Sequence, residues 1–232
     1  MALAPDSSEN FAREVDENLR RDQARDFAQK YGRWLIVAAV LLLAAVGGWL
    51  YWQHRQDQQA QRQSEELSQV YGDIARNQMQ TVPPRLQALG QSDNDVIRAS
   101  ALLTEAALAL EKNDRATALN RFKQISGDGS LPQPYRDLAI VRSTTLEFDT
   151  LKPEEIIARL QPLAQSGKPW FGSAGELTAM AYLRQNQPER AGKLFAAIAA
   201  DPQVPATMRS RAVQIAGTLG VDASASLPGI SQ

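Results

Sequence analysis

Side chains that commonly carry catalysis are scarce in this chain of 232 residues. It has no Cys and a single His, His54, which argues against thiol nucleophiles, disulfides and His-based catalytic or metal-binding arrangements. Two acidic pairs, Glu65-Glu66 and Glu154-Glu155, are adjacent in sequence, and adjacent side chains on a helix point in different directions. We therefore expect no enzyme, no catalytic residues, no metal ligands and no cofactor.

Two further classes of site are disfavoured by charge and by motif. The stretch "SGDGS" at 126–130 lacks the Gly-Lys-Ser/Thr end of a phosphate-binding loop, so it reads as a turn. Residues 53–232 carry 19 Lys and Arg and 19 Asp and Glu, so this part is neutral. A neutral domain lacks the basic surface of a nucleic-acid binder, and we expect no nucleic-acid partner.

The elements that would position any site are predicted to be helices. Aromatic residues make up 6% of the chain, and Ala, Leu, Gln, Arg and Glu, which favour helix, dominate its composition. Pro, Gly, Asn and Asp interrupt the chain at intervals that suit antiparallel helix pairs. The expected fold class is all-α.

One stretch is predicted to cross a membrane. Trp34 to Gln53 is a run of 20 residues without a formal charge, enough for a helix of about 30 Å, the thickness of a hydrocarbon core. Aromatic residues flank both ends of the run, as at membrane interfaces. The run has neither the small-residue cleavage site of a signal peptide nor the polar stripe of a core helix. Residues 33–54 are therefore expected to form a retained, single transmembrane helix.

Basic residues around the span predict its orientation. Residues 13–33 contain six Lys or Arg, whereas residues 54–73 contain two. The richer side usually stays in the cytoplasm. We expect residues 1–32 in the cytoplasm, as a disordered start followed by an amphipathic helix, and residues 55–219 in the periplasm of the bacterial inner membrane. Residues 220–232 are expected to be a disordered tail.

A degenerate internal repeat organises the large domain. "LEKNDRATALNRFKQI" at 110–125 aligns without gaps to "LRQNQPERAGKLFAAI" at 183–198, an offset of 73 residues. That offset is about two tetratricopeptide periods of 34 residues. A more degenerate unit is expected between them, with Ile156, Leu160 and Leu163 at its apolar positions. Pro162 is expected to bend the helix of this unit. A first, weaker unit uses Leu67, Val70, Tyr71 and Ile74, then Leu86 and Leu89. Such pairs stack into an α-solenoid, here of about three to four pairs, because one pair cannot bury its own apolar face.

The spacing that the two repeat units share can be explained by packing. Ala118 and Ala191 sit early in the second helix, where a small side chain lets the first helix approach closely. Phe122 and Phe195 lie four residues later, on the same face, and would fill the space between pairs. Asn113 and Asn186 occupy the interhelix turns, where Asn tolerates a left-handed backbone.

These stretches resemble a known family. "YGRWLIVAAVLLLAAVGGWLYWQ", "RASALLTEAALALEKNDRATALNRF" and "AMAYLRQNQPERAGKLFAAI" are similar to the YfgM-type membrane-anchored tetratricopeptide-like proteins of proteobacteria. The resemblance covers roughly residues 11–218. It implies an ancillary subunit of the SecYEG translocon with a periplasmic domain. It also implies a membrane-anchored periplasmic chaperone as partner and a part in handing over exported polypeptides.

An interaction module is the function that this combination favours. The inward positions of first helices are the expected protein-binding residues; they are Leu103, Ala107, Leu110, Glu111, Met180, Leu183 and Arg184. For the Leu residues, packing between helices is the alternative role. Ala44, Gly47 and Gly48 could let a partner helix approach closely in the membrane. The alternative function is a structural coordinator of envelope or division machinery that binds no client.

Overall fold

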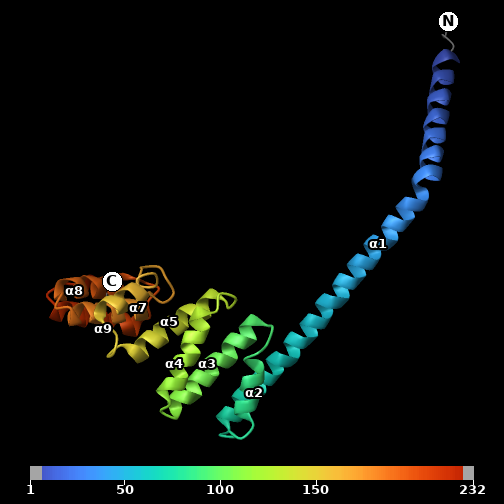
Figure 1. Ribbon diagram of the computed structural model, residues 1–232. Helices are drawn as coiled ribbons and strands as arrows, with labels where there is room; N and C mark the ends of the chain where they lie inside the picture. Colours follow the sequence, from blue (N-terminus) through green and yellow to red (C-terminus); the bar gives the residue numbers. More distant parts are fainter. Residues whose placement is uncertain (1–6, 227–232) are drawn as a thin grey trace. The chain divides into compact units, whose positions relative to one another are not determined.

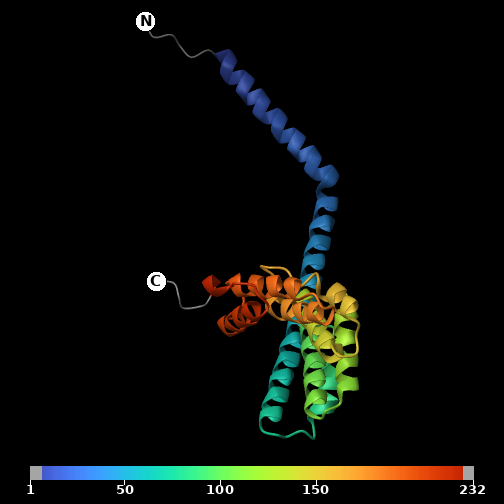
Figure 2. The ribbon, with the colours of Figure 1, turned by 90° about the vertical axis from the view of Figure 1, so that its left-hand side faces the viewer.

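The computed structural model describes residues 7–226, leaving the side chains of residues 7–29, 31–33, 35 and 39 undescribed. The described part contains helices and no strand (Figures 1 and 2). The all-α prediction is therefore confirmed. The helices are α1 (Ser7–Ala75), α2 (Val82–Leu89), α3 (Asp95–Glu111), α4 (Arg115–Gly127), α5 (Gln133–Glu147), α6 (Pro153–Leu160), α7 (Phe171–Arg184), α8 (Pro188–Ala200), α9 (Ala206–Thr218) and the 3-10 turn η1 (Ser224–Ser226).

Helix α1 carries the apolar stretch. Among the described residues, its Ile36–Ala75 portion is the one helix that is long and apolar enough to cross a membrane. Large apolar side chains of α1 are exposed, including Trp34, Trp49 and Trp52. Exposure of so much apolar surface suits a lipid environment and would be costly in water. The expected stripe of the preceding amphipathic helix falls on residues whose side chains are not described.

The chain divides into two compact units, residues 1–62 and 63–232. Within the second unit, four helix pairs follow one another: the end of α1 with α2, α3 with α4, α5 with α6, and α7 with α8. Helix α9 packs on α8 and closes the stack. Each of four core clusters joins consecutive helices, so apolar burial is shared between neighbouring pairs. This is the solenoid expected from the repeat.

Repeat residues occupy the core as predicted. Ala118 and Ala191 are fully buried in the second and fourth pairs, and Phe122 and Phe195 are buried with them. The first pair buries Leu67, Val70, Leu86 and Leu89, as expected from the apolar spacing of its degenerate repeat. Apart from Tyr71, which is 45% exposed, the core positions named above could therefore be assigned from spacing.

The third pair departs from one prediction. Ile156, Leu160 and Leu163 are buried, but α6 ends at Leu160 instead of bending at Pro162. Proline lacks the N–H that would donate to the carbonyl of Ala158 and continue the helical hydrogen bonds. Gln161 therefore caps the helix, and the chain leaves α6 through a loop of ten residues, 161–170.

Asparagine closes three of the four turns that lie within helix pairs. Asn77, Asn113 and Asn186 have φ of 58°, 59° and 57°, the positive non-Gly values among the described residues. In each turn the Asn N–H donates to the carbonyl three residues back, and the next N–H donates to the carbonyl five residues back. This is the Schellman arrangement, which satisfies the last carbonyls of the first helix. The prediction for Asn113 and Asn186 is confirmed, and Asn77 extends it to the first pair.

A buried carboxylate holds the loop between α6 and α7 in place through hydrogen bonds. Asp201 is 5% exposed, and its carboxylate accepts hydrogen bonds from the Gly167 N–H at 2.8 Å, the Ser166 hydroxyl at 2.7 Å and the Gln203 N–H at 2.9 Å. These hydrogen bonds, led by the one from Gly167, hold the pKa of Asp201 below its ordinary value of 3.8. The Ser166 and Gly167 part of this loop is thereby fixed to the end of α8.

The C-terminal segment differs from the expected tail. A disordered tail was expected from residue 220, yet Ala223 is buried in the last core cluster and η1 lies against α8 and α9. Gly192 makes this possible, because a Cβ added there would lie 2.7 Å from Cγ2 of Val221. Residues 227–232 lie outside the described residues.

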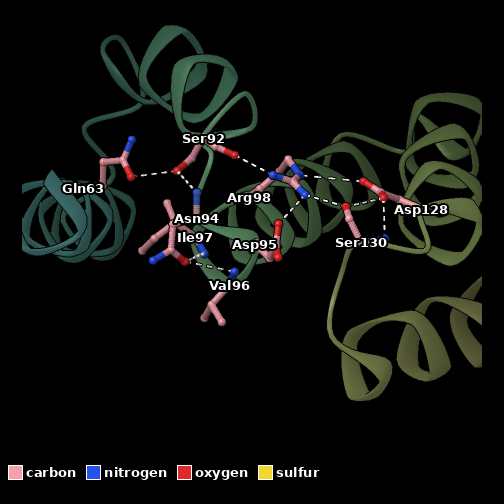
Figure 3. A network of polar contacts seen from close by, with 9 residues as sticks. All are labelled: Gln63, Ser92, Asn94, Asp95, Val96, Ile97, Arg98, Asp128 and Ser130. Atoms are coloured by element: carbon pink, nitrogen blue, oxygen red, sulfur yellow. Dashed lines mark hydrogen bonds and ion pairs between the residues drawn. The ribbon is translucent and has the colours of Figure 1, made fainter. Parts of the chain in front are cut away.

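An arginine links the second pair to the turn that follows it (Figure 3). Arg98 donates to the Ser92 carbonyl at 2.6 Å, to Asp95 at 2.6 Å and to the Ser130 hydroxyl at 2.8 Å. Its Nε lies 3.7 Å from an Asp128 carboxylate oxygen. This side chain therefore joins the start of α3 to the turn before α3 and to the turn after α4, as its five donors allow.

We predict that the left-handed turns tolerate Gly but not a β-branched residue. Asn186→Gly should leave the free energy of unfolding nearly unchanged, whereas Asn186→Val should lower it by about 1–2 kcal/mol, since a β-branched residue is strained at positive φ. Urea unfolding of the detergent-solubilised chain, followed by circular dichroism, measures both. Equal stability of the two variants would contradict the role given to this turn.

We also predict a pH-dependent contribution from Asp201. Because its folded-state pKa is lowered, its stabilisation is present above the ordinary value of 3.8 and is lost as pH falls through the folded pKa. Asp201→Asn should thus lower the thermal midpoint at about pH 7, and the difference from the unmodified protein should shrink towards about pH 3. The exposed Asp149→Asn serves as a control and should change little at either pH. A constant difference for Asp201→Asn would disprove the linkage.

Candidate protein-interaction surface

The expected binding residues of α3 have mixed environments. Leu103 and Leu110 are half-buried and pack on the core cluster of the second pair. Ala107 and Glu111 are exposed. The two leucines are thus used for packing between helices, and only Ala107 and Glu111 present their side chains to solvent.

Helix α7 offers a clearer apolar surface. Met180 is 42% exposed and Leu183 is 37% exposed, on consecutive turns of the helix. Outside the apolar stretch of α1, the other exposed large apolar side chains of the described part are Tyr71 and Val96. Exposed apolar side chains grouped on one helix are typical of a contact surface, whereas isolated ones are ordinary.

Arg184 is engaged within the chain. Its guanidinium donates to the carbonyl of Phe148 and, at 3.1 Å, to that of Leu151. It also lies 5.3 Å from the centroid of the Phe148 ring. The turn between α5 and α6 lacks the left-handed Asn of the other turns, and Arg184 satisfies its carbonyls instead. Arg184, which the sequence predicted as a binding residue, therefore has a structural role in holding the α5–α6 turn.

A carboxylate on the same turn ties three helices together. Glu147 of α5 accepts from Lys123 of α4 at 2.6 Å and from Arg159 of α6 at 2.7 Å. Burial raises the pKa of Glu147, but the hydrogen bonds from Lys123 and Arg159 outweigh it and hold the pKa below the ordinary 4.5. The middle of the stack is thus held by polar contacts as well as apolar ones.

The predicted residues form two groups, one on α3 and one on α7. The equivalent position on α5, Ser143, is buried, and its hydroxyl donates to the carbonyl of Ile140. The first helix of the third pair therefore contributes no exposed side chain at this position. Sequence spacing could not reveal that the α5 position is buried, because its burial depends on how neighbouring helices cover α5.

Tyr71 belongs to the α3 group, although its spacing suggested a core position. It is 45% exposed, and the Thr104 hydroxyl donates to its phenol oxygen at 3.4 Å. Tyr71 lies 36 residues before Ala107 in the sequence, so it occupies in the first pair the position that Ala107 occupies in the second. That equivalence was the sequence signal that could have identified it as a surface residue.

The arrangement supports noncovalent recognition. The described residues contain no group of three or more His, Cys, Asp or Glu that could hold a metal ion. The first helices present apolar side chains at Met180 and Leu183 on α7 and at Tyr71 on α1, and the carboxylate of Glu111 is exposed on α3. Such surfaces bind polypeptide through apolar contacts with a polar border.

The small residues of α1 form a second candidate contact. Ala44, Gly47 and Gly48 are exposed, and a Cβ added at either glycine would meet no atom within 4 Å. No described residue of this chain therefore fills the space beside them. A neighbouring membrane helix could approach at this face.

Comparison with known proteins gives one family and one relative. The family model described as a tetratricopeptide repeat-like domain matches residues 25–215. An ancillary SecYEG translocon subunit from Haemophilus influenzae is 26% identical over 114 residues. That alignment covers 49% of this chain and 56% of the relative, so the chain spans about half the length of the curated relative it matches. No solved structure matches the chain.

Both findings confirm the resemblance to YfgM-type proteins and support a role in protein–protein interaction. The apolar part of α1 and a translocon-associated relative also fit a membrane-anchored protein. The family model covers more than half of the residues, and its repeat agrees with four stacked helix pairs. The chain therefore belongs to the tetratricopeptide repeat-like domain family.

Proposed function

We propose that this protein is a membrane-anchored interaction module that serves as an ancillary subunit of the SecYEG translocon. The observation that carries the proposal is the joining, in one chain, of an apolar helix able to cross a membrane and a tetratricopeptide-like stack. The name of the Haemophilus influenzae relative supports the choice of translocon. Anchoring would keep the stack at the membrane where exported chains emerge.

The domain is proposed to lie in the periplasm, with the N-terminus in the cytoplasm. Six Lys or Arg precede the span in residues 13–33, against two in residues 54–73. Translocating the less basic side is favoured, so residues 55–219 would cross the membrane. The bacterial inner membrane is the compartment in which this topology meets the translocon.

The apolar surface of α7 is the proposed binding face. Met180 and Leu183 are exposed, and neither has the internal role that occupies Arg184. Unfolded exported polypeptides and a membrane-anchored periplasmic chaperone both present apolar segments that could pack here. The module would thus hold a client or chaperone near the translocon and assist hand-over between them.

The span itself is proposed to contribute a helix contact. The face formed by Ala44, Gly47 and Gly48 would let a translocon helix approach closely, and close packing drives helix association in lipid. This contact would place the ancillary subunit beside the translocon, whatever the periplasmic domain binds.

Topology is tested with single cysteines, since the chain has none of its own. Ala158 is exposed on α6, so Ala158→Cys should react with a membrane-impermeant maleimide in intact spheroplasts. Ser7→Cys should react only after the membrane is permeabilised. The reverse pattern would overturn the orientation.

Binding is tested with a photoreactive amino acid at Met180 or Leu183 of the full-length protein in cells. We expect crosslinks to translocon subunits, to a periplasmic chaperone or to exported chains, because these side chains are exposed and apolar. The same amino acid at the exposed Ala158, on a second helix, is the matched control and should give few crosslinks. Crosslinks confined to fixed envelope or division proteins would favour a coordinator without clients, and no crosslinks would refute the face.

A further inference from the structure

A second surface lies on the other side of α7, between α6, α7 and α8. It is a groove of about 630 Å³, within the size range of ligand sites. Its inner wall is formed by buried or half-buried side chains, and exposed side chains form its rim. The inner residues include Ile157, Ala164, Thr178, Tyr182 and Leu194. Met180 and Leu183 do not line it, so it is distinct from the proposed α7 binding face.

The rim of this groove is positively charged. Arg190 and Lys193 line it, and no Asp or Glu does. Among the described residues, no carboxylate forms an ion pair with either cation within 4.0 Å. Two cations next to a recessed surface, without an internal counter-charge, create a site that attracts an anion.

Arg190 is held in place without being neutralised. Its guanidinium lies 4.2 Å from the centroid of the Tyr182 ring and donates to the Tyr182 hydroxyl at 3.0 Å. It also donates to the side-chain oxygen of Gln187 at 2.9 Å. All of these partners are uncharged, so the charge remains available while the side chain is oriented. A planar guanidinium prepared in this way suits a carboxylate.

The remaining lining residues suit a polypeptide. Gln161 and Gln165 are exposed at the rim and carry amides that can pair with backbone N–H and carbonyl groups. Ile157 and Leu194 offer an apolar floor for a side chain of the bound segment. A flat bilayer surface cannot reach into a recessed floor of this kind, so the combination favours a peptide over a membrane.

The equivalent groove two repeats earlier is neutral. It lies between α2, α3 and α4, has about 370 Å³, and is related to the first groove by the 73-residue offset. Its cations are matched by acids: Arg121 Nε lies 2.6 Å from Glu105 Oε2, and Lys112 is accompanied by Asp114. The fold makes both hollows, but only the α6–α8 groove has an excess of positive charge.

We infer that the α6–α8 groove binds an acidic polypeptide segment, with its carboxylates at Arg190 and Lys193 and an apolar side chain on the floor. This site goes beyond the proposed translocon function and does not depend on Met180 or Leu183. It gives the module a second, charge-selective contact, through which it could hold one partner while the α7 binding face holds another.

The test uses the full-length protein in nanodiscs of zwitterionic lipid. The probes are a fluorescent peptide of alternating Glu and Leu and its counterpart of alternating Gln and Leu, followed by anisotropy. The acidic peptide should bind, and the neutral peptide should bind more weakly. Lys193→Glu should weaken binding of the acidic peptide by about tenfold, because an attractive charge becomes a repulsive one. Added salt should weaken binding to the unmodified protein.

Lys112→Glu is the matched control, since both lysines are exposed and line equivalent grooves. It should change the affinity by less than about twofold. Arg190→Lys should retain more binding than Arg190→Gln, and circular dichroism should show each variant folded. Absence of binding, or equal loss with Lys112→Glu, would overturn the proposal. Displacement by soluble dihexanoyl-phosphatidylglycerol at concentrations as low as those of the peptide would assign the groove to lipid headgroups and would also overturn it.

Discussion

The structure of the large domain depends on the fact that a helix pair cannot bury its own apolar face. A pair joined by a short turn covers one side of each helix and leaves the other side apolar, so the next pair must cover it. Close approach of the two helices requires a small residue, and Ala118 and Ala191 provide it at full burial. Phe122 and Phe195 then fill the space towards the neighbouring pair. The four core clusters follow from this one constraint.

The ends of the stack show how the constraint is met where no further pair follows. At the start, the first helix of the first pair is the end of α1, whose Leu67 and Val70 enter the core. At the other end, α9 covers α8, and the chain then crosses α8 at Gly192 to place Ala223 in the same cluster. A stack closed in this way has its first-helix surfaces and its grooves left for binding.

Polar contacts decide which of those surfaces are available. Arg184 satisfies carbonyls of the α5–α6 turn, and Glu147 joins α4, α5 and α6, so the third pair is used to hold the stack together. The two grooves differ in charge, because Glu105 neutralises Arg121 in one whereas Arg190 in the other stacks on Tyr182. The repeat therefore produces both hollows, and the residue types at their surfaces give each hollow its own charge.

The sequence by itself determined the elements whose signals are local. A run of 20 uncharged residues, the 73-residue offset and Asn at the turns were sufficient for the anchor, the helix pairs and the left-handed turns, because length, period and backbone preference act within a few residues. Features that depend on residues distant in sequence were decided only by the tertiary structure. Spacing could not show that Asp201 would hold Ser166 and Gly167, or that Arg184 would be occupied by the turn at Phe148. Nor could it place uncompensated cations beside an apolar floor, since charge balance in a groove depends on which helices meet there.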